Sequence, residues 1–414
     1  MLCYGNLKLS NKKHGFSEFN SEKPYICKMK IERKIKPKLE AYDKQMRSVA
    51  VMGIRQSGKT TICKDLFGNY SYVNFEDIAT FQNATSDPIG FLDSNKNGVV
   101  LDEVQRIPIM FNYLQGVLDN QDERGKYILA GSSNFLLNEK INQSLAGRIG
   151  YINMYPLSYN EIPDYKSVDI WQMILKGGFP EIWISDFSPI IFYQSYLQSV
   201  IEKDIRQLVN IKDLSLFQQL LKLLATRISQ ELNYLKLGQE LGIDSKTCQA
   251  WISYLQVAGI IFLLPSYHKN YGKRIIKKSK LYFIDSGIVC NLLGITNDSY
   301  LENHPLKGEL FENFVVSNCI KLNSYLLVPK QLFFWRSQAG VEIDLLIEEN
   351  GTLIPVEIKS GKTPHSSWFK NCLLFEKYTG TNLNPIIIYN SDSFDYSDGK
   401  KLMNFYELEG LFKE

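Results

Sequence analysis

The chain has 414 residues, of which 44% are hydrophobic and 22% are charged, and its formal net charge is +3. This length is too great for one hydrophobic core and predicts two or three domains, and the composition is that of an ordinary soluble globular protein. No apolar stretch approaches the ~20 residues of a membrane span, and the N-terminus lacks the apolar core of a signal peptide. We therefore expect a cytoplasmic protein that does not contact a membrane.

Seven cysteines are scattered from Cys3 to Cys372 without a C-x-x-C pair, which favours reduced buried thiols over disulfides or zinc. Residues 1–47 contain twelve Lys or Arg against five Asp or Glu, so this segment either contacts nucleic acid or is solvated, and we favour solvation. Residues 1–28 are polar and aperiodic. They predict a loosely ordered extension, and translation starts either at Met1 or at Met29.

A helix is expected over residues 31–46, and a β-branched run then leads into a glycine-rich turn. The spacing Gly53-x-x-x-x-Gly58-Lys59-Thr60 is that of a P-loop, in which backbone N–H groups surround a polyphosphate. Lys59 is expected to reach the β- and γ-phosphates, and Thr60 to bind Mg²⁺. The alternative, an ordinary strand-to-helix turn, would not explain the presence of Lys59 and Thr60 at these positions. The predicted ATP contacts are Gly53, Ile54, Arg55, Gln56, Ser57, Gly58, Lys59, Thr60 and Thr61.

Residues 98–103 form an apolar strand that ends in Asp102 and Glu103. This is a Walker B pattern, in which we expect Asp102 to bind Mg²⁺ through its water shell. Glu103 is expected to polarise the water that attacks the γ-phosphate. Strands that end in two carboxylates are common in parallel sheets, so the P-loop upstream is what makes this interpretation specific.

Residues 127–130 predict another buried strand, after which Ser132 or Ser133 either senses the γ-phosphate or caps a turn. Arg148 is a candidate cation for the charge on the γ-phosphate, in its own chain or across an interface, and a surface ion pair is the alternative. Strands and helices alternate throughout residues 29–160. This alternation predicts a three-layer α/β P-loop ATPase core with a parallel sheet.

Residues 161–213 have a helical pattern and predict a small lid. Three helical patterns and two apolar strands follow within residues 214–295, in the order of a winged helix-turn-helix. These five elements are expected over residues 216–229, 235–241, 245–258, 260–264 and 280–284.

The segment that joins the two strands is rich in lysine and arginine and contains no acid, which is typical of a nucleic-acid contact. However, Lys246 is the only basic residue near the start of the third helix, and winged helices in ATPases often pack against other domains. DNA contact and domain packing both stay open. The residues expected to contact DNA are Lys269, Lys273, Arg274, Lys277 and Lys278.

Residues 296–414 predict a last α/β domain that begins with a helix over residues 308–320, which carries Glu312. Strands are expected over residues 333–336, 341–347 and 353–359. Asn350 and Gly351 separate the last two of them and are the strongest available signal for a two-residue hairpin turn.

This turn would place Asp344 opposite Glu357 and Glu342 opposite Lys359. Two carboxylates ~5 Å apart on one face of a sheet repel each other. A second divalent metal that bridges Asp344 and Glu357, with Glu312 completing the shell, would relieve the repulsion. The alternative is a solvated face that Lys359 neutralises. The opposite face would be apolar, formed by Ile343, Leu345, Ile347, Ile354, Val356 and Ile358.

Seven motifs occur in a fixed order: G-I-R-Q-S-G-K-T-T, V-V-L-D-E-V-Q, S-L-A-G-R-I, K-G-G-F-P-E, K-L-Y-F-I-D-S-G-I, G-E-L-F-E-N-F-V-V and F-F-W-R-S-Q-A-G-V-E-I-D-L-L-I…P-V-E-I-K-S-G. Over residues 30–380 this set resembles the prokaryotic AAA-type P-loop ATPases with a C-terminal domain of unknown function related to PD-(D/E)xK nucleases. The resemblance implies a P-loop core, a helical lid, a winged helix and a restriction-endonuclease-like end. It places Glu312, Asp344, Glu357 and Lys359 at nuclease-type positions.

The sequence thus predicts an ATP-binding ATPase that hydrolyses Mg-ATP and acts on DNA through a nuclease-like C-terminal domain. One alternative is a nucleotide-controlled switch that binds an unidentified protein partner, with an inactive nuclease-like fold. Another is a DNA-binding regulator in which the basic hairpin dominates. Glu103 favours hydrolysis, because a protein that only binds ATP does not need this carboxylate. The oligomeric state stays open.

Overall fold

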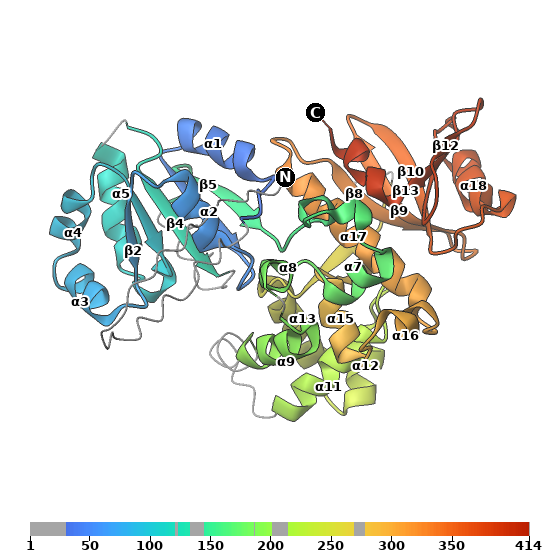
Figure 1. Cartoon of the computed structure of the whole chain (residues 1–414), viewed down its shortest axis with the longest axis horizontal. Helices are drawn as coiled ribbons and strands as arrows, with labels where there is room; N and C mark the ends of the chain where they lie inside the picture. The colour runs from blue at the N-terminus through green and yellow to red at the C-terminus, as the bar shows by residue number, and fades with distance from the viewer. Residues whose placement is uncertain are drawn as a thin grey trace, which may run out of the picture. The chain divides into compact units, whose positions relative to one another are not determined.

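The apolar runs around the P-loop form a sheet of parallel strands in this computed structural model (Figure 1). The structure describes residues 30–120, 123–132, 145–185, 187–200, 214–268 and 278–413. Within them, the sheet has the order β2-β3-β4-β1-β5. Its strands are β1 (Ser48–Gly53), β2 (Ser71–Asn74), β3 (Val99–Asp102), β4 (Tyr127–Ser132) and β5 (Ile149–Met154). The predicted parallel sheet is therefore confirmed.

Helices cover both faces of this sheet, because successive side chains of each strand point to opposite sides. Val49 and Val51 of β1 pack with α1 and α2, whereas Ala50 and Met52 pack in the cluster that contains α3, α4 and α5. These helices are α1 (Lys36–Gln45), α2 (Lys59–Leu66), α3 (Ile78–Ser86), α4 (Pro88–Ser94) and α5 (Met110–Asn120). The result is the predicted three-layer α/β arrangement.

Short helices and one antiparallel hairpin make up the middle of the chain. They are α7 (Ile170–Lys176), α8 (Pro180–Ile184), α9 (Pro189–Val200), α11 (Leu214–Ala225), α12 (Tyr234–Leu241), α13 (Ser245–Val257), β6 (Ile261–Pro265), β7 (Ser279–Phe283), α15 (Ser286–Leu292) and α16 (Asp298–Glu302). Asp244 caps α13, since its Oδ1 accepts the N–H groups of Lys246 and Thr247 at 2.9 Å. The order of helices and strands is the expected one, and the winged helix-turn-helix stays a prediction.

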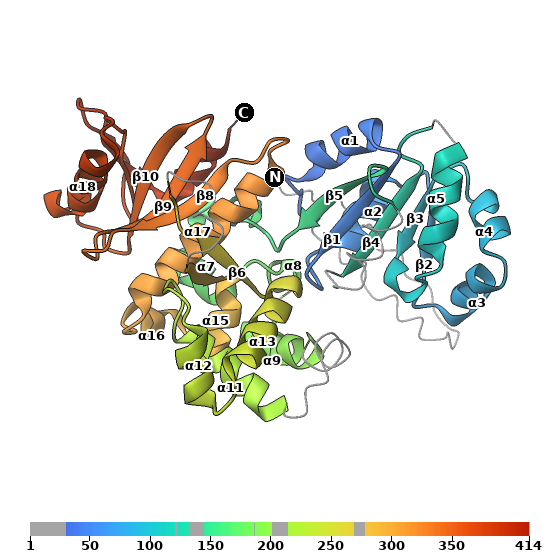
Figure 2. The same ribbon diagram turned by 180° about the vertical axis from the view of Figure 1, so that it is seen from behind.

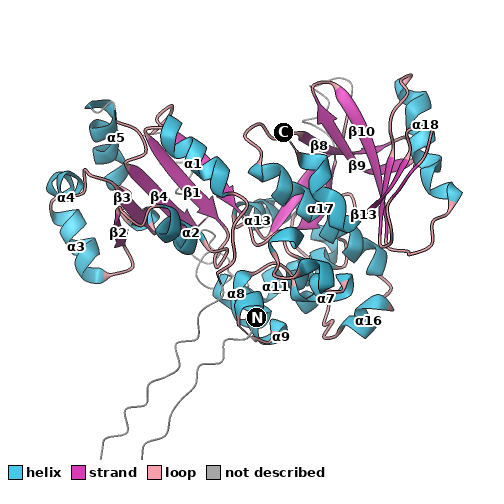
Figure 3. Cartoon of the chain, turned by 45° about the horizontal axis from the view of Figure 1, so that its top comes forward, coloured by secondary structure: helices cyan, strands magenta, loops and turns pink. Residues whose placement is uncertain are grey.

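The described strands of residues 331–404 form a mixed sheet with the order β12-β13-β11-β10-β9-β8. They are β8 (Gln331–Arg336), β9 (Glu342–Glu349), β10 (Thr352–Lys359), β11 (Ile386–Tyr389), β12 (Phe394–Asp395) and β13 (Lys401–Asn404). Helix α17 (Lys307–Tyr325) packs on one face, and α18 (Lys370–Thr379) packs on the other (Figures 2 and 3). The C-terminal part is thus α/β, and its relation to restriction endonucleases stays a prediction.

Single turns of 3-10 helix complete the described elements. They are η1 (Val104–Arg106), η2 (Tyr159–Glu161), η3 (Tyr165–Ser167), η5 (Ser366–Phe369) and the longer η6 (Phe405–Phe412).

The β9–β10 hairpin has the predicted turn. Asn350 and Gly351 both have positive φ angles, 50° and 82°, which is the requirement of a type I′ turn. The predicted register is confirmed from this turn as far as the pair Val356 and Leu345. Beyond that pair, the described ladder of β9 and β10 contains no further backbone pair. The Asp344 carboxylate instead accepts the N–H of Ile358.

A shift in register between β8 and β9 changes one face of the sheet. Phe333 pairs with Leu346, but Trp335 pairs with Ile343, so β9 carries an extra residue at this point. Ile343 consequently packs with Trp335, on the side of α18, and not with the residues that face α17. The expectation that Ile343 shares an apolar face with Leu345 is therefore wrong.

The middle and C-terminal parts share one hydrophobic core. A single cluster of buried residues includes most of the core from Leu157 to Phe412 together with Ile54 of the P-loop, and α17 packs against β7 as well as β10. The described residues from Ile31 onward form one compact unit. The chain therefore packs continuously across the predicted limit at residue 296, and the domain limits themselves stay predictions.

All five described cysteines are buried and free, as expected for reduced thiols: Cys63, Cys248, Cys290, Cys319 and Cys372. Burial raises the pKa of the Cys63 thiol to about 12. The described helices include none that is both long and apolar enough to cross a membrane.

Replacing Gly351 by Ala tests the hairpin turn. No atom lies within 4 Å of the added Cβ, so the cost comes from the φ angle of +82° alone, about 1–2 kcal/mol in the free energy of unfolding. The matched control is Gly308→Ala in α17, where the space is equally open and the backbone is helical. Urea unfolding should show a loss for the first variant only. Equal effects would mean that this turn does not fix the hairpin.

Candidate functional site

The loop between β1 and α2 needs both of its glycines. A Cβ on Gly53 would lie 2.1 Å from the carbonyl oxygen of Met154 on the neighbouring strand. Gly58 has a φ angle of +93° at the start of α2, and Gln56 also has a positive φ angle, 58°. These backbone conformations turn the chain around a small concavity directly before a helix N-terminus, which is the arrangement that binds phosphate.

Lys59 lies inside this loop. It is buried, and its Nζ donates to the carbonyl oxygens of Gly53 at 3.0 Å and Ile54 at 2.9 Å. Burial lowers the pKa of the ammonium to about 8, although the nearby carboxylates of Glu103 and Asp102 raise it. The loop thus holds a desolvated lysine on carbonyl groups that phosphate oxygens can replace.

The ends of β1 and β3 bring Thr60 and Asp102 together from distant parts of the sequence. Thr60 Oγ1 donates to Asp102 Oδ2 at 2.7 Å, and the Tyr72 hydroxyl donates to the same oxygen at 2.6 Å. Asp102 Oδ1 accepts the N–H of Glu103 at 3.0 Å. A hydroxyl beside a carboxylate is a set of hard oxygen donors that fits Mg²⁺. Tyr72 carries no sequence signal and was not predicted.

Glu103 follows Asp102 in a left-handed conformation, with a φ angle of 54°. For a residue with a side chain this costs about 1–2 kcal/mol, and such strain is typically found at functional sites. The amide of Gln105 donates to its carboxylate. Burial raises the pKa of Glu103, while the neighbouring Arg55 opposes this rise. The predicted catalytic carboxylate therefore lies next to the predicted Mg²⁺ ligand, in partly desolvated surroundings.

Arg148 lies at the other edge of this sheet. It directly precedes β5, whose first residue, Ile149, pairs with Ser48 at the start of β1, whereas the P-loop follows the end of β1. The two are roughly 16 Å apart along the strand. Arg148 instead forms a two-fold ion pair with Asp119, in which NH2 lies 3.0 Å from Oδ2. This corrects the expectation that Arg148 serves the nucleotide of its own chain. The alternative, a surface ion pair, agrees with the contact between Arg148 and Asp119.

The structure does not describe the side chains of Ser132 and Ser133, the two predicted phosphate sensors. The backbone of Ser132 pairs with Gly53 at the nucleotide edge of the sheet, but its side chain and the whole of Ser133 lie outside the described residues. Both roles stay predictions.

Arg33 was not expected near the nucleotide, because it belongs to the basic segment that we took as solvated. It is buried, and its NH1 donates to the carbonyl oxygen of Ser57 in the P-loop at 2.6 Å. Its NH2 donates to the carbonyl oxygen of Tyr155 at 2.8 Å, and its Nε pairs with Glu161 at 3.0 Å. The P-loop is therefore tied to the segment that follows β5.

The C-terminal sheet brings together three of its four predicted site residues. Lys359 Nζ lies 2.5 Å from Glu357 Oε2 and 3.7 Å from Asp344 Oδ2. Asp344 Oδ2 also accepts the N–H of Ile358 at 2.9 Å, so a side chain takes the place of a backbone partner of β10. Burial and the charge of Asp344 raise the pKa of Glu357 to about 8. This is a compact, poorly solvated group of charges at one end of the hairpin.

The fourth residue, Glu312, is engaged elsewhere. Its Oε1 accepts the Tyr282 hydroxyl at 2.6 Å and lies 3.2 Å from the Nζ of Lys280, both on β7. Glu342 also pairs with Lys280, at 2.5 Å, and with Arg336, which corrects the prediction that it faces Lys359. Within the described ranges, no group of three or more His, Cys, Asp or Glu side chains is arranged to hold a metal. The second divalent metal stays a prediction.

Most of the predicted DNA-contacting residues lie outside the described residues: Lys269, Lys273, Arg274 and Lys277. Lys278 is described and is exposed, and its Nζ lies 3.4 Å from the carboxylate of Glu231. DNA contact by this hairpin therefore stays a prediction.

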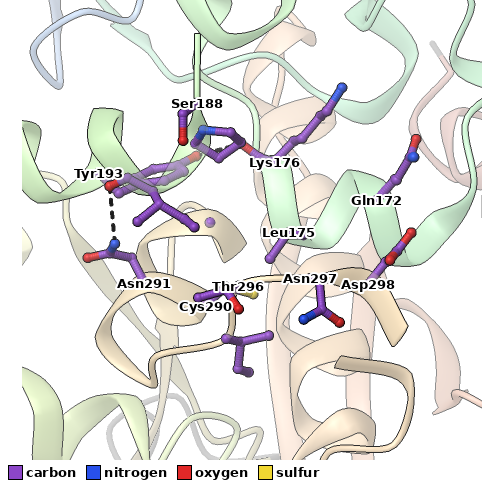
Figure 4. Close-up of a pocket in the computed structure, with 14 residues that line it drawn as sticks. Gln172, Leu175, Lys176, Ser188, Tyr193, Cys290, Asn291, Thr296, Asn297 and Asp298 are labelled. Atoms are coloured by element: carbon purple, nitrogen blue, oxygen red, sulfur yellow. Dashed lines mark hydrogen bonds between the residues drawn. The ribbon is translucent and has the colours of Figure 1, made fainter. Parts of the chain in front are cut away.

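A separate cavity of about 340 Å³ lies among α7, α9, α15 and α16 (Figure 4). Tyr193 closes one side, with its hydroxyl within hydrogen-bond distance of two acceptors, the carbonyl oxygen of Lys176 at 2.8 Å and Asp285 Oδ1 at 2.6 Å. Asn291 donates to the carbonyl oxygen of Ile190 at 3.5 Å. None of the predicted site residues that the structure describes lines this cavity.

Three family models match consecutive parts of the chain. Residues 45–163 match an AAA domain, residues 167–299 match a domain of unknown function (DUF8612), and residues 307–408 match a second domain of unknown function (DUF4143). The first match, together with the P-loop geometry, supports an AAA-type P-loop ATPase. The other two matches carry no functional description.

Relatives of known sequence extend over most of the chain. An uncharacterized protein of Mycobacterium tuberculosis is 28% identical over 323 residues, which are 77% of this chain and 71% of that protein. An uncharacterized protein of Methanocaldococcus jannaschii is 26% identical over 382 residues, 83% of this chain and 82% of that protein. Among solved structures, a Walker-type ATPase of Pyrococcus abyssi is similar with a TM-score of 0.43 and 14% identity, over 63% of this chain and 94% of that one.

Lys59→Met is expected to weaken ATP binding about 10- to 100-fold, because a charge-assisted hydrogen bond contributes ~1.5–3 kcal/mol. The measurement is calorimetric titration with Mg-ATP. Lys64→Met is the matched control, since Lys64 is exposed on the same helix and its Nζ lies 3.9 Å from the centre of the Tyr72 ring. It should bind ATP as the unaltered protein does. Undiminished binding by the Lys59 variant would place the nucleotide elsewhere.

Proposed function

We propose that this chain is an ATPase that hydrolyses Mg-ATP at the edge of its parallel sheet. The observation that carries the proposal is the hydrogen bond between Thr60 and Asp102, next to the buried Lys59 and the strained Glu103. A P-loop that only binds phosphate needs neither the carboxylate pair nor its placement beside the helix N-terminus.

Each residue has a distinct part in the proposed reaction. Lys59 exchanges its two carbonyl partners for β- and γ-phosphate oxygens and neutralises their charge. Thr60 and Asp102 would hold Mg²⁺, which supplies further charge neutralisation when it is bound with the nucleotide. Glu103 orients the attacking water and accepts its proton, and its raised pKa makes it the better base.

Glu103→Gln is expected to reduce ATP turnover at least ~100-fold while ATP still binds, because it removes the proton acceptor and preserves the shape of the side chain. Phosphate release is measured with and without duplex DNA. Glu123→Gln is the control, since Glu123 is exposed and pairs with the nearby Lys126 at 3.3 Å. Stimulation of turnover by DNA supports action on DNA. Turnover that the Glu103 variant keeps would refute the assigned base.

We further propose that the C-terminal domain acts on DNA as a metal-dependent nuclease. The support is the group formed by Asp344, Glu357 and Lys359, in which the ammonium lies within 4 Å of both carboxylates. A divalent metal at Asp344 and Glu357 would activate water there, and Lys359 would stabilise the charge on the phosphate that is attacked.

Asp344→Ala is expected to abolish cleavage of DNA in Mg²⁺ or Mn²⁺, because it removes one of the two metal-binding carboxylates. Gel assays with duplex, single-stranded and branched DNA give the readout. The control is Asp395→Ala, an exposed aspartate on β12 that pairs with Lys401. If the intact protein cleaves none of these substrates, the nuclease proposal fails, while the ATPase proposal is unaffected.

A second candidate function is a nucleotide-controlled switch that binds a protein partner. The observation in its favour is a buried polar chain from the P-loop to α17. Arg33 contacts the carbonyl of Ser57 and pairs with Glu161, and Glu161 accepts the hydroxyl of Tyr325, near the end of α17, at 2.8 Å. A phosphate that displaces the P-loop backbone would move Arg33, and these hydrogen bonds would transmit the movement to α17. Tight ATP binding with negligible turnover, and no effect of DNA, would favour this function.

A further inference from the structure

Lys280 is a buried cation that no predicted function uses. It lies on β7, where its backbone pairs with Leu264 of β6 and bridges to Glu231. Its side chain is only 2% exposed, although most lysines keep the ammonium in water. The strand fixes the base of this side chain, and its ammonium reaches the carboxylates of the C-terminal domain.

Three carboxylates from two elements converge on this ammonium. The Nζ of Lys280 lies 2.5 Å from Glu342, 3.2 Å from Glu312 and 3.9 Å from Asp344 Oδ1. These acids come from α17 and β9, and the β6–β7 hairpin supplies the cation that contacts all three of them. Without a cation, the acids would repel one another in poorly solvated surroundings.

Asp344 lies between two ammonium groups. Its Oδ1 faces Lys280, and its Oδ2 faces Lys359 at 3.7 Å. The predicted metal shell needs both Asp344 and Glu312, but Glu312 already accepts Tyr282 and Lys280. Two oxygen atoms of that shell, Glu312 Oε1 and Asp344 Oδ1, thus already face a covalently attached monovalent cation.

We propose that Lys280 is the resident cation among Glu312, Glu342 and Asp344 Oδ1: it occupies the place that a divalent ion would take between these three acids, and it keeps such ions out of that place while β7 stays in position. This place shares Asp344 with the site for which we proposed nuclease activity, but the inference does not require cleavage. On this proposal, the position of the β6–β7 hairpin decides whether Glu312, Glu342 and Asp344 can take up a metal together, whereas the metal proposed for cleavage would lie at Asp344 and Glu357.

The test is Mn²⁺ binding by full-length protein without nucleotide. Two measurements report it: the melting temperature, and the electron paramagnetic resonance signal of the Mn²⁺ that stays free. Lys280→Met should lower the melting temperature, because it removes the positive charge that three poorly solvated acids share, and Mn²⁺ should restore it. We expect Mn²⁺ to bind this variant at least about tenfold more tightly than the unaltered protein. Adding Asp344→Asn should remove the gain, which locates the ion at this site.

Two further variants keep the outcome decisive. Lys280→Gln retains hydrogen-bond donors without the charge and should also gain Mn²⁺ binding, even if the Met variant folds poorly. Lys278→Met, two residues earlier and 69% exposed at the side chain, should behave as the unaltered protein. The proposal is overturned if the unaltered protein binds Mn²⁺ as tightly as the Lys280 variants in an Asp344-dependent manner, or if neither variant gains Mn²⁺ binding. DNA cleavage does not enter the readout, so the nuclease proposal succeeds or fails separately.

Discussion

The parallel pairing of β1, β4 and β3 is the constraint on which the nucleotide site depends. Gly53 is level with Ser132, and Asp102 is level with Ala130, so the ends of the strands meet at one edge of the sheet. This alone brings the hydroxyl of Thr60 to the carboxylate of Asp102. A slip of one residue in β3 would turn Asp102 to the opposite face. The two clusters that cover the sheet oppose the slip, because β3 is buried on both sides.

Helix α17 is the second element on which much of the structure depends. Several polar side chains along it are buried, and some of them have partners in other parts of the chain. Asn313 binds both backbone groups of Phe283, at 2.8 and 3.1 Å, and Lys321 donates to the carbonyl oxygen of Leu157 at 3.0 Å. Near the end of the helix, Lys38 donates to the carbonyl oxygen of Leu326. Buried polar groups are costly to leave unpaired, so these contacts hold α17 in one rotational position.

The sequence predicted those features that depend on short-range spacing. The P-loop, the Walker B carboxylates and the Asn350-Gly351 turn each need particular residues within a few positions of one another, and their geometry follows from that spacing. Lys280 shows where such reasoning ends. It belongs to a basic run that is typical of solvated or DNA-binding segments, and only the packing of β7 against α17 and β9 buries it. The prediction that Arg148 serves the nucleotide of its own chain was wrong for a related reason. The motif that contains Arg148 does not reveal at which edge of the sheet it lies.

The left-handed backbone at Glu103 has a consequence for the variation of this chain. Glycine or asparagine adopts this conformation at lower cost than glutamate, so the residue that would best stabilise the turn is not the one that can accept a proton. Fold stability and chemistry therefore make opposing demands on a single position. A population of sequences selected only for resistance to heat is expected to drift away from a carboxylate there, whereas selection for turnover would retain it.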